Sequence, residues 1–130
     1  MRSVARECVY KFLFSRLFNP DDEGLFTVLC KELPDSDKKF ASELLSAVLK
    51  DENTYLERIA ELSVGYKIER IHSTDKISLL IGMAELSAFK ETPVPVVINE
   101  AVNLSAKYSG ETSTDFVNGI LGEYVKRYGK

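Results

Sequence analysis

The most informative stretch of this 130-residue chain is TPVPVVINEAVNLSAKYSGETSTDFVNGILG, from Thr92 to Gly122. Pro95 suits the first turn of a helix, where a backbone N–H needs no partner. The apolar residues after it recur at helical spacing until Ser109-Gly110 breaks the pattern. Thr112 or Ser113 then caps a last helix. The stretch predicts two consecutive helices, and it contains almost no residue that could do chemistry.

The same helical spacing covers the rest of the chain, and strand signals are nearly absent. Pro20 and Pro34 end two of the segments, because proline cannot continue a helix. We therefore expect an all-α bundle of about seven helices, forming a single domain over residues 1–130. The expected helices cover residues 3–18, 25–33, from 35 or 36 to 49, 55 to about 65, from 73 or 74 to 89, 95–108, and from 112 or 113 to 128.

Glycines in two of these helices point to close helix packing. Gly119 and Gly122 lie three apart in the last helix, where each costs about 1 kcal/mol relative to alanine. We expect a neighbouring backbone to approach there, so that Gly119→Leu would destabilise the fold by about 1–3 kcal/mol. Gly82-Met83-Ala84 offers a similarly small surface in the long central helix.

Composition narrows the function. The net charge is −3, so any nucleic-acid site must be a local basic patch. Cys8 and Cys30 are far apart in sequence, and we expect them to be buried thiols in a reducing compartment. The sequence also allows a disulfide between them. The first residues lack the pattern of a secretory leader, so we expect none, and no apolar run of about 20 residues occurs in the sequence. We expect a cytosolic protein that is not associated with a membrane.

Residues for catalysis or metal binding are missing. His72 has no partner at metal-ligand spacing, and we expect it to be solvent-exposed. The sequence has no phosphate-binding glycine loop and no nucleophile elbow. We expect no enzymatic activity, no catalytic residue, no metal and no cofactor.

The first helix is unusual because it is apolar on two sides, with one stripe at residues 5, 9, 12 and 13 and a second at 10, 14, 17 and 18. Such a helix is either covered on both sides or keeps an exposed docking surface at Tyr10, Phe14 and Phe18. Arg2 and Arg6 lie one turn apart at its start, where cations oppose the helix dipole. They are either solvated or placed to bind an external phosphate.

Three stretches carry a resemblance to the NusB family of bacterial transcription antitermination factors. The strongest is Ile98-Asn99-Glu100-Ala101-Val102 followed by Phe116-Val117-Asn118-Gly119-Ile120-Leu121. The second is ARECVYKFLFS, residues 5–15, which is similar to the family's arginine-led first helix. The third consists of Tyr66, Arg70 and Ile71, followed by Glu85-Leu86 before Pro93. The likeness runs from Arg2 to about Val125.

This resemblance implies a helical fold of two packed subdomains and a function without catalysis. It implies binding of single-stranded boxA RNA from ribosomal RNA leaders, together with the small-subunit ribosomal protein NusE. It also implies joining the elongating RNA polymerase with other Nus factors. The implied RNA positions are Arg2, Arg6, Lys107, Thr112 and Phe116, where Phe116 either stacks on a base or packs in the core. The implied docking positions for the protein partner are Phe14, Phe18 and Asp75, the last at an exposed helix start.

The chain departs from the family pattern mainly at basic positions. Ser3 and Val4 replace arginines that are common in the family, and Leu80 replaces another. Ala106 replaces a lysine, although Lys107 stands next to it, and Ser109 replaces a glycine. These changes leave a second hypothesis open, a helical protein-interaction adaptor with little RNA affinity. A third, a relative of the NusB-like domain of ribosomal RNA methyltransferases, would have to act without a catalytic domain. The apolar surface of the first helix could also serve a homodimer.

Overall fold

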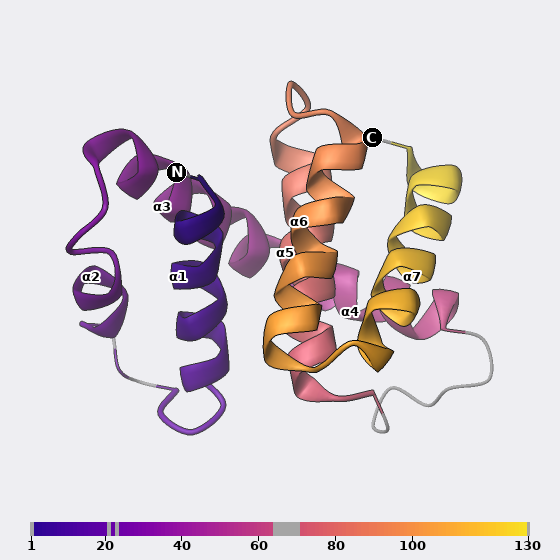
Figure 1. The fold of residues 1–130 in the computed structure, drawn as a ribbon, viewed down its shortest axis with the longest axis horizontal. Coiled ribbons are helices and arrows are strands. Elements are labelled where there is room, and N and C mark those ends of the chain that lie inside the picture. Colours follow the sequence, from indigo (N-terminus) through magenta and orange to yellow (C-terminus); the bar gives the residue numbers. More distant parts are fainter. Residues whose placement is uncertain (1, 21, 23, 64–70, 130) are drawn as a thin grey trace.

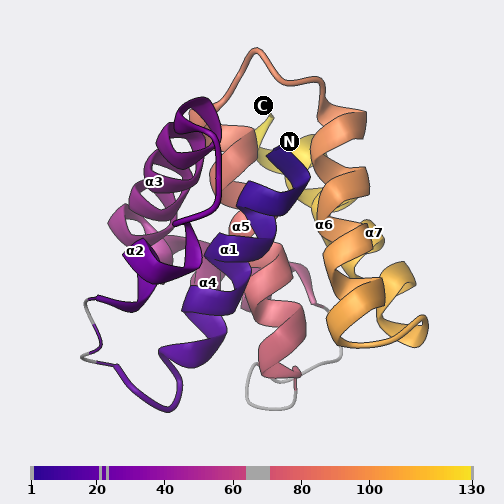
Figure 2. The same cartoon turned by 60° about the vertical axis from the view of Figure 1, so that its left-hand side comes forward.

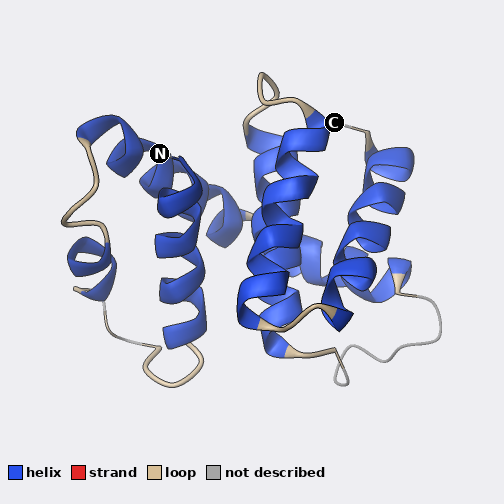
Figure 3. Ribbon diagram, in the orientation of Figure 1, coloured by secondary structure: helices blue, strands red, loops and turns tan. Residues whose placement is uncertain are grey.

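The computed structural model describes residues 2–20, 22, 24–63 and 71–129. Within these residues the chain forms seven helices and no strand (Figure 3), as the sequence predicts. Tyr66 and Arg70, which contribute to the weakest part of the resemblance, lie outside the described residues. The helices are α1 Arg2–Ser15, α2 Leu25–Leu29, α3 Asp35–Lys50, α4 Glu52–Leu62, α5 Ser73–Ala88, α6 Val94–Tyr108 and α7 Thr112–Tyr128.

The helices form two packed groups, α1–α3 and α4–α7, as Figure 1 shows. Helix α5 joins them, because it contacts α1 and α3 in one group and α4, α6 and α7 in the other. Every residue from Ile77 to Leu86 in α5 is buried. The helix enclosed on all sides is therefore α5, whereas α1 is covered along only part of its length. Neither α5 nor any other described helix is long and apolar enough to cross a membrane.

The helix boundaries differ from the expected ones mainly at the carboxyl ends. Helix α1 stops at Ser15 and α2 at Leu29, and turns occupy the remaining predicted residues in both cases. The last two helices begin where expected, and Gly110 between them has φ +109°. Glycine adopts this positive φ without strain, and this backbone conformation separates α6 from α7 at Ser109-Gly110.

The close helix contact predicted at Gly119 and Gly122 is wrong. A Cβ atom built on either residue meets nothing within 4 Å, and Gly119 is exposed. The tight position is Gly82 in α5, where a Cβ would lie 2.9 Å from Leu121 Cδ1 and 3.3 Å from Ala101 Cβ. Glycine at residue 82 therefore allows α5, α6 and α7 to pack closely.

This contrast predicts opposite effects for the same substitution. Gly82→Leu forces a large side chain against Leu121 and Ala101, and overpacking of this kind costs about 1–3 kcal/mol. Gly119→Leu should instead stabilise the helix by up to about 1 kcal/mol, because it removes an exposed helical glycine. Urea denaturation of both variants measures the difference. Equal destabilisation by the two substitutions would contradict this packing.

Cys8 and Cys30 meet between α1 and α2. Both are buried free thiols, and Cys8 Sγ donates to the backbone oxygen of Leu29, the residue before Cys30, at 3.2 Å. Burial raises the pKa of both thiols, that of Cys30 to about 11. Neither is therefore activated for nucleophilic chemistry. Phe12 packs edge-on to Phe26, and this contact and the two thiols hold α2 against α1.

Candidate nucleic-acid and protein interface

Helices α1 and α6 lie side by side and run in the same direction, as Figure 2 shows. Polar contacts join them at both ends, among them one from Ser3 Oγ to Glu100 at 2.8 Å and one from Lys107 Nζ to Glu7 at 2.6 Å. Between the helices lies a cavity of about 150 Å³, which we call the α1–α6 groove. Its lining residues are Ser3, Glu7, Glu100, Asn103, Leu104 and Lys107.

Arg2 is exposed at the start of α1, one residue before Ser3 of the α1–α6 groove. Its guanidinium carbon lies 4.5 Å from the centre of the Phe40 ring in α3, which orients the side chain by a cation–π contact. The charge remains accessible to solvent on the other side. The position of Arg2 therefore fits the predicted contact with a phosphate.

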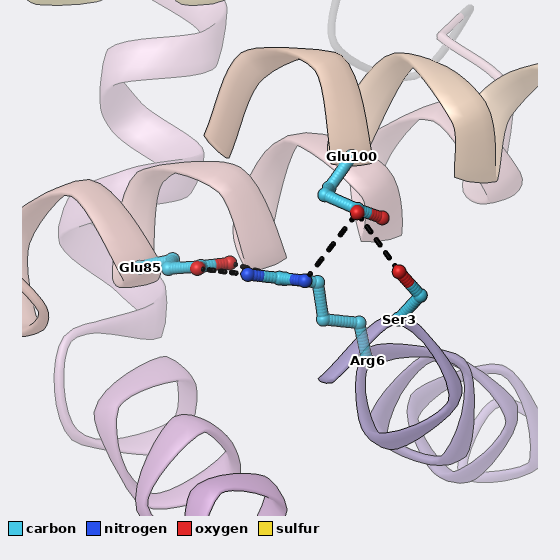
Figure 4. A network of polar contacts seen from close by, with 4 residues as sticks. All are labelled: Ser3, Arg6, Glu85 and Glu100. Atoms are coloured by element: carbon cyan, nitrogen blue, oxygen red, sulfur yellow. Dashed lines mark hydrogen bonds and ion pairs between the residues drawn. The ribbon is translucent and has the colours of Figure 1, made fainter. Parts of the chain in front are cut away.

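Arg6 occupies a different environment, and its predicted role as an exposed RNA contact is wrong. The residue is only 3% exposed. Its Nε and Nη2 donate to the two carboxylate oxygens of Glu85 in α5, at 2.7 and 2.5 Å. Nη1 lies 3.6 Å from Glu100 in α6 (Figure 4). The guanidinium thus joins α1 to the central helix and has no side open to an external phosphate.

The burial of Arg6 explains why α1 tolerates cations at its start. Its counter-charge is internal, because Glu85 is only 1% exposed and faces it directly. A buried charge requires such a partner. Sequence reasoning missed Glu85, although a carboxylate within the apolar run ISLLIGMAEL could have indicated a buried ion pair.

Lys107 is exposed at the other end of the α1–α6 groove, but it is paired. Its ammonium group donates to Glu7 Oε1, and the hydroxyl of Tyr108 donates to the same oxygen at 2.5 Å. Burial raises the pKa of Glu7, but the hydrogen bonds from Lys107 and Tyr108 outweigh it and the pKa lies below its usual value. Glu7 is therefore a stable anion beside the predicted RNA contact.

The start of α7 supplies the remaining predicted RNA positions. Thr112 is the first residue of the helix and is exposed. Phe116 is half-buried against the core, and it lines a cavity with Leu62 and Ser63 at the end of α4. The structure thus places Thr112 in solvent but places Phe116 toward α4, a position that fits core packing.

The predicted protein-docking surface lies at the end of α1. Phe14 and Phe18 are 38% and 70% exposed, and their rings meet edge-on with centres 5.5 Å apart. Leu17 beside them is also exposed. Apolar side chains of this size rarely gather on a surface that contacts only water. The prediction of an exposed docking stripe therefore fits Phe14 and Phe18.

Tyr10 departs from that stripe because it is buried. Its ring stacks on Tyr108 with centres 4.4 Å apart. Burial and the charge of Asp75 raise the pKa of Tyr10 to about 12. Next to it lies an apolar cavity of about 310 Å³, which we call the tyrosine cavity. Its lining residues are Tyr10, Lys11, Phe14, Thr74 and Tyr108.

The expectation that Asp75 lies at an exposed helix start is wrong. Asp75 is only 4% exposed, and its Oδ2 accepts a hydrogen bond from Ser113 Oγ at 3.2 Å. The carboxylate therefore connects the start of α5 to the start of α7. Asp75→Lys would place an ammonium group in this buried position, so we expect this substitution to destabilise the fold.

No three His, Cys, Asp or Glu side chains in the described part of the chain are arranged to hold a metal ion. The α1–α6 groove and the aromatic docking surface offer charge, hydrogen bonds and exposed aromatic rings.

A family model, described as NusB family, matches residues 2–126. The chain belongs to the NusB family.

Similar proteins and structures agree with this assignment. The chain is 33% identical to the transcription antitermination protein NusB of Pediococcus pentosaceus, over 96% of this chain and 97% of that one. NusB of T. maritima superposes with a TM-score of 0.92 at 24% identity, over 100% of this chain and 94% of that one. A structure of NusB and NusE in complex with dsRNA superposes with a TM-score of 0.86 at 24% sequence identity, over 98% of this chain and 97% of that one. The fold of this NusB-family chain is therefore that of the solved NusB structures.

Proposed function

We propose that this NusB-family chain is a transcription antitermination factor that binds boxA-type leader RNA of ribosomal RNA operons jointly with NusE. In this proposal the complex joins the elongating RNA polymerase with other Nus factors. The observation that carries it is that α1 borders two different surfaces, the polar α1–α6 groove and the apolar tyrosine cavity. One helix therefore offers a place for an RNA strand beside a place for a protein.

The RNA surface has few available cations. Arg2 is accessible, Lys107 is paired with Glu7, and Arg6 is buried. The groove also contains the carboxylate of Glu100. Since phosphate contacts supply much of the affinity for nucleic acid, we expect weak RNA binding by the chain alone. A basic protein partner beside the groove would raise that affinity.

The protein surface consists of the tyrosine cavity and the exposed rings of Phe14 and Phe18. Aromatic residues are enriched at the centres of protein interfaces, where burial of an exposed ring stabilises the complex. The relative whose structure contains NusE and dsRNA supports NusE as the occupant and RNA as the second ligand.

A second candidate function is a protein-interaction adaptor with little RNA affinity. The burial of Arg6 and the pairing of Lys107 favour it, because they reduce the positive charge available to RNA. The two functions differ in one observable property. An antitermination factor of the proposed type binds RNA specifically when NusE is present, whereas the adaptor binds NusE but does not bind RNA.

The salt dependence of RNA binding tests the role of Arg2. If Arg2 neutralises one phosphate of a single strand, Arg2→Ala should flatten the log–log slope of affinity against salt by about 0.7. We would titrate boxA-type RNA with the NusE-bound protein at several salt concentrations. Lys126→Ala is the matched control, because it removes an exposed cation from the end of α7. Identical slopes for wild type and Arg2→Ala would remove Arg2 from the RNA site.

A further inference from the structure

Glu7 lies between the two proposed binding surfaces. Its carboxylate lines the α1–α6 groove, and one oxygen, Oε1, accepts from both Lys107 and Tyr108. Lys107 belongs to the groove, whereas Tyr108 belongs to the tyrosine cavity. The side chain of Lys107 is 60% exposed, so a ligand can reach it, but its ammonium group already has an anionic partner.

The position of Glu7 is fixed by Tyr108. The Tyr108 ring stacks on Tyr10 with an angle of 16° between the ring planes, and Tyr10 is only 2% exposed. The Tyr108 hydroxyl therefore has a defined place, and it holds Glu7 Oε1 beside Lys107. The carboxylate cannot turn away from Lys107 without losing a second hydrogen bond.

The other charged groups near Glu7, Glu100 in the groove and Lys11 in the tyrosine cavity, do not separate Glu7 from Lys107. Glu100 accepts from Ser3 and lies near Arg6, so it is already in use within the fold. Lys11 lies one turn after Glu7 and acts on the same carboxylate. A phosphate that approaches Lys107 would thus also meet the anionic carboxylate of Glu7 beside it.

We propose that Glu7 limits the RNA affinity of this chain, because its carboxylate pairs with Lys107 and opposes the negative charge of a phosphate that binds there. This inference rests on the proposed RNA-binding function, and it names the residue that sets the strength of that binding. The ligand group that competes with Glu7 is the phosphodiester anion of a single RNA strand.

Glu7→Gln tests the inference directly, because glutamine keeps an oxygen acceptor for Tyr108 and removes the charge that holds Lys107. We expect the NusE-bound variant to bind boxA-type RNA about threefold to fivefold more tightly, the size expected for one partly exposed ion pair. Glu123→Gln is the matched control, since it removes the same charge from an exposed pair with Lys126 in α7. It should change the affinity by less than about twofold.

A double-mutant cycle separates the ion pair from the general effect of charge. In a Lys107→Met background, Glu7→Gln should give no further gain, because the cation it releases is absent. Thermal melts of each variant show that the folds are intact. An equal gain from Glu123→Gln, or a gain that persists with Lys107→Met, would overturn the inference.

The same titration separates this inference from the function on which it rests. Wild-type binding in the presence of NusE, with no gain for Glu7→Gln, would contradict the inference alone. Absence of RNA binding by wild type and every variant, with NusE present, would contradict the proposed function and the inference together.

Discussion

Replacing Arg6 with alanine is expected to destabilise the fold by about 3–5 kcal/mol, because it leaves the carboxylate of Glu85 buried without a counter-charge. Arg6 donates two short hydrogen bonds to Glu85, and these join α1 to α5. The guanidinium also lies 5.2 Å from the centre of the Phe40 ring in α3. Its loss would weaken the contact between the two helix groups.

Urea denaturation measures this effect, with Arg2→Ala as the control. Arg2 has the same chemistry one turn earlier on α1, but it is exposed, so its replacement should cost less than about 1 kcal/mol. The double variant Arg6→Met/Glu85→Leu should be more stable than Arg6→Ala, because it leaves no unpaired charge at Glu85. Equal stabilities of Arg2→Ala and Arg6→Ala would contradict the buried ion pair.

Phe18→Asp is expected to weaken binding of NusE by about thirtyfold or more while leaving the stability of the free chain nearly unchanged. Phe18 is 70% exposed, so a charge there meets water in the free protein. In the complex the same charge would be buried among apolar groups. Truncation of a central aromatic residue in an interface costs about 2 kcal/mol or more, and a charge adds a desolvation cost.

Val96→Asp is the control for Phe18→Asp, because Val96 is also an exposed apolar residue but lies at the start of α6. Calorimetric titration with purified NusE measures both affinities. Sedimentation of the free chain tests the other occupant considered for this surface, a second copy of the same chain. An unchanged NusE affinity in Phe18→Asp would contradict the assigned docking surface. So would a wild-type dimer that the Phe18→Asp substitution dissociates but that the addition of NusE leaves intact.

Periodicity predicts most of the fold, because helices bury one face and that face has a period visible in the sequence. The seven helices and the break at Gly110 follow from local patterns of this kind, whereas the pattern left open whether Phe18 is covered or exposed. The packing of Gly82 against Leu121 was not predictable in this way. Which glycine meets a neighbouring helix depends on how the helices rotate against one another, and no local pattern records that rotation.

The site was less predictable for the same reason. The partner of Arg6 is 79 positions away, that of Asp75 is 38 positions away, and Glu7 meets Lys107 across 100 positions. Each of these residues looks like a solvated charge at a helix end when only its neighbours in sequence are considered. The resemblance assigned Arg6 and Asp75 to binding surfaces, whereas the structure places their charges inside the fold.

We propose that this chain binds RNA in cooperation with NusE, and the decisive measurement is its affinity for boxA-type RNA with and without NusE. We would measure fluorescence anisotropy of labelled single-stranded RNA at one fixed salt concentration, with scrambled RNA and Phe18→Asp as controls. We expect weak binding by the chain alone and at least tenfold tighter binding when NusE is present, an increase that Phe18→Asp abolishes. An affinity that NusE leaves unchanged, or that scrambled RNA matches, would contradict it.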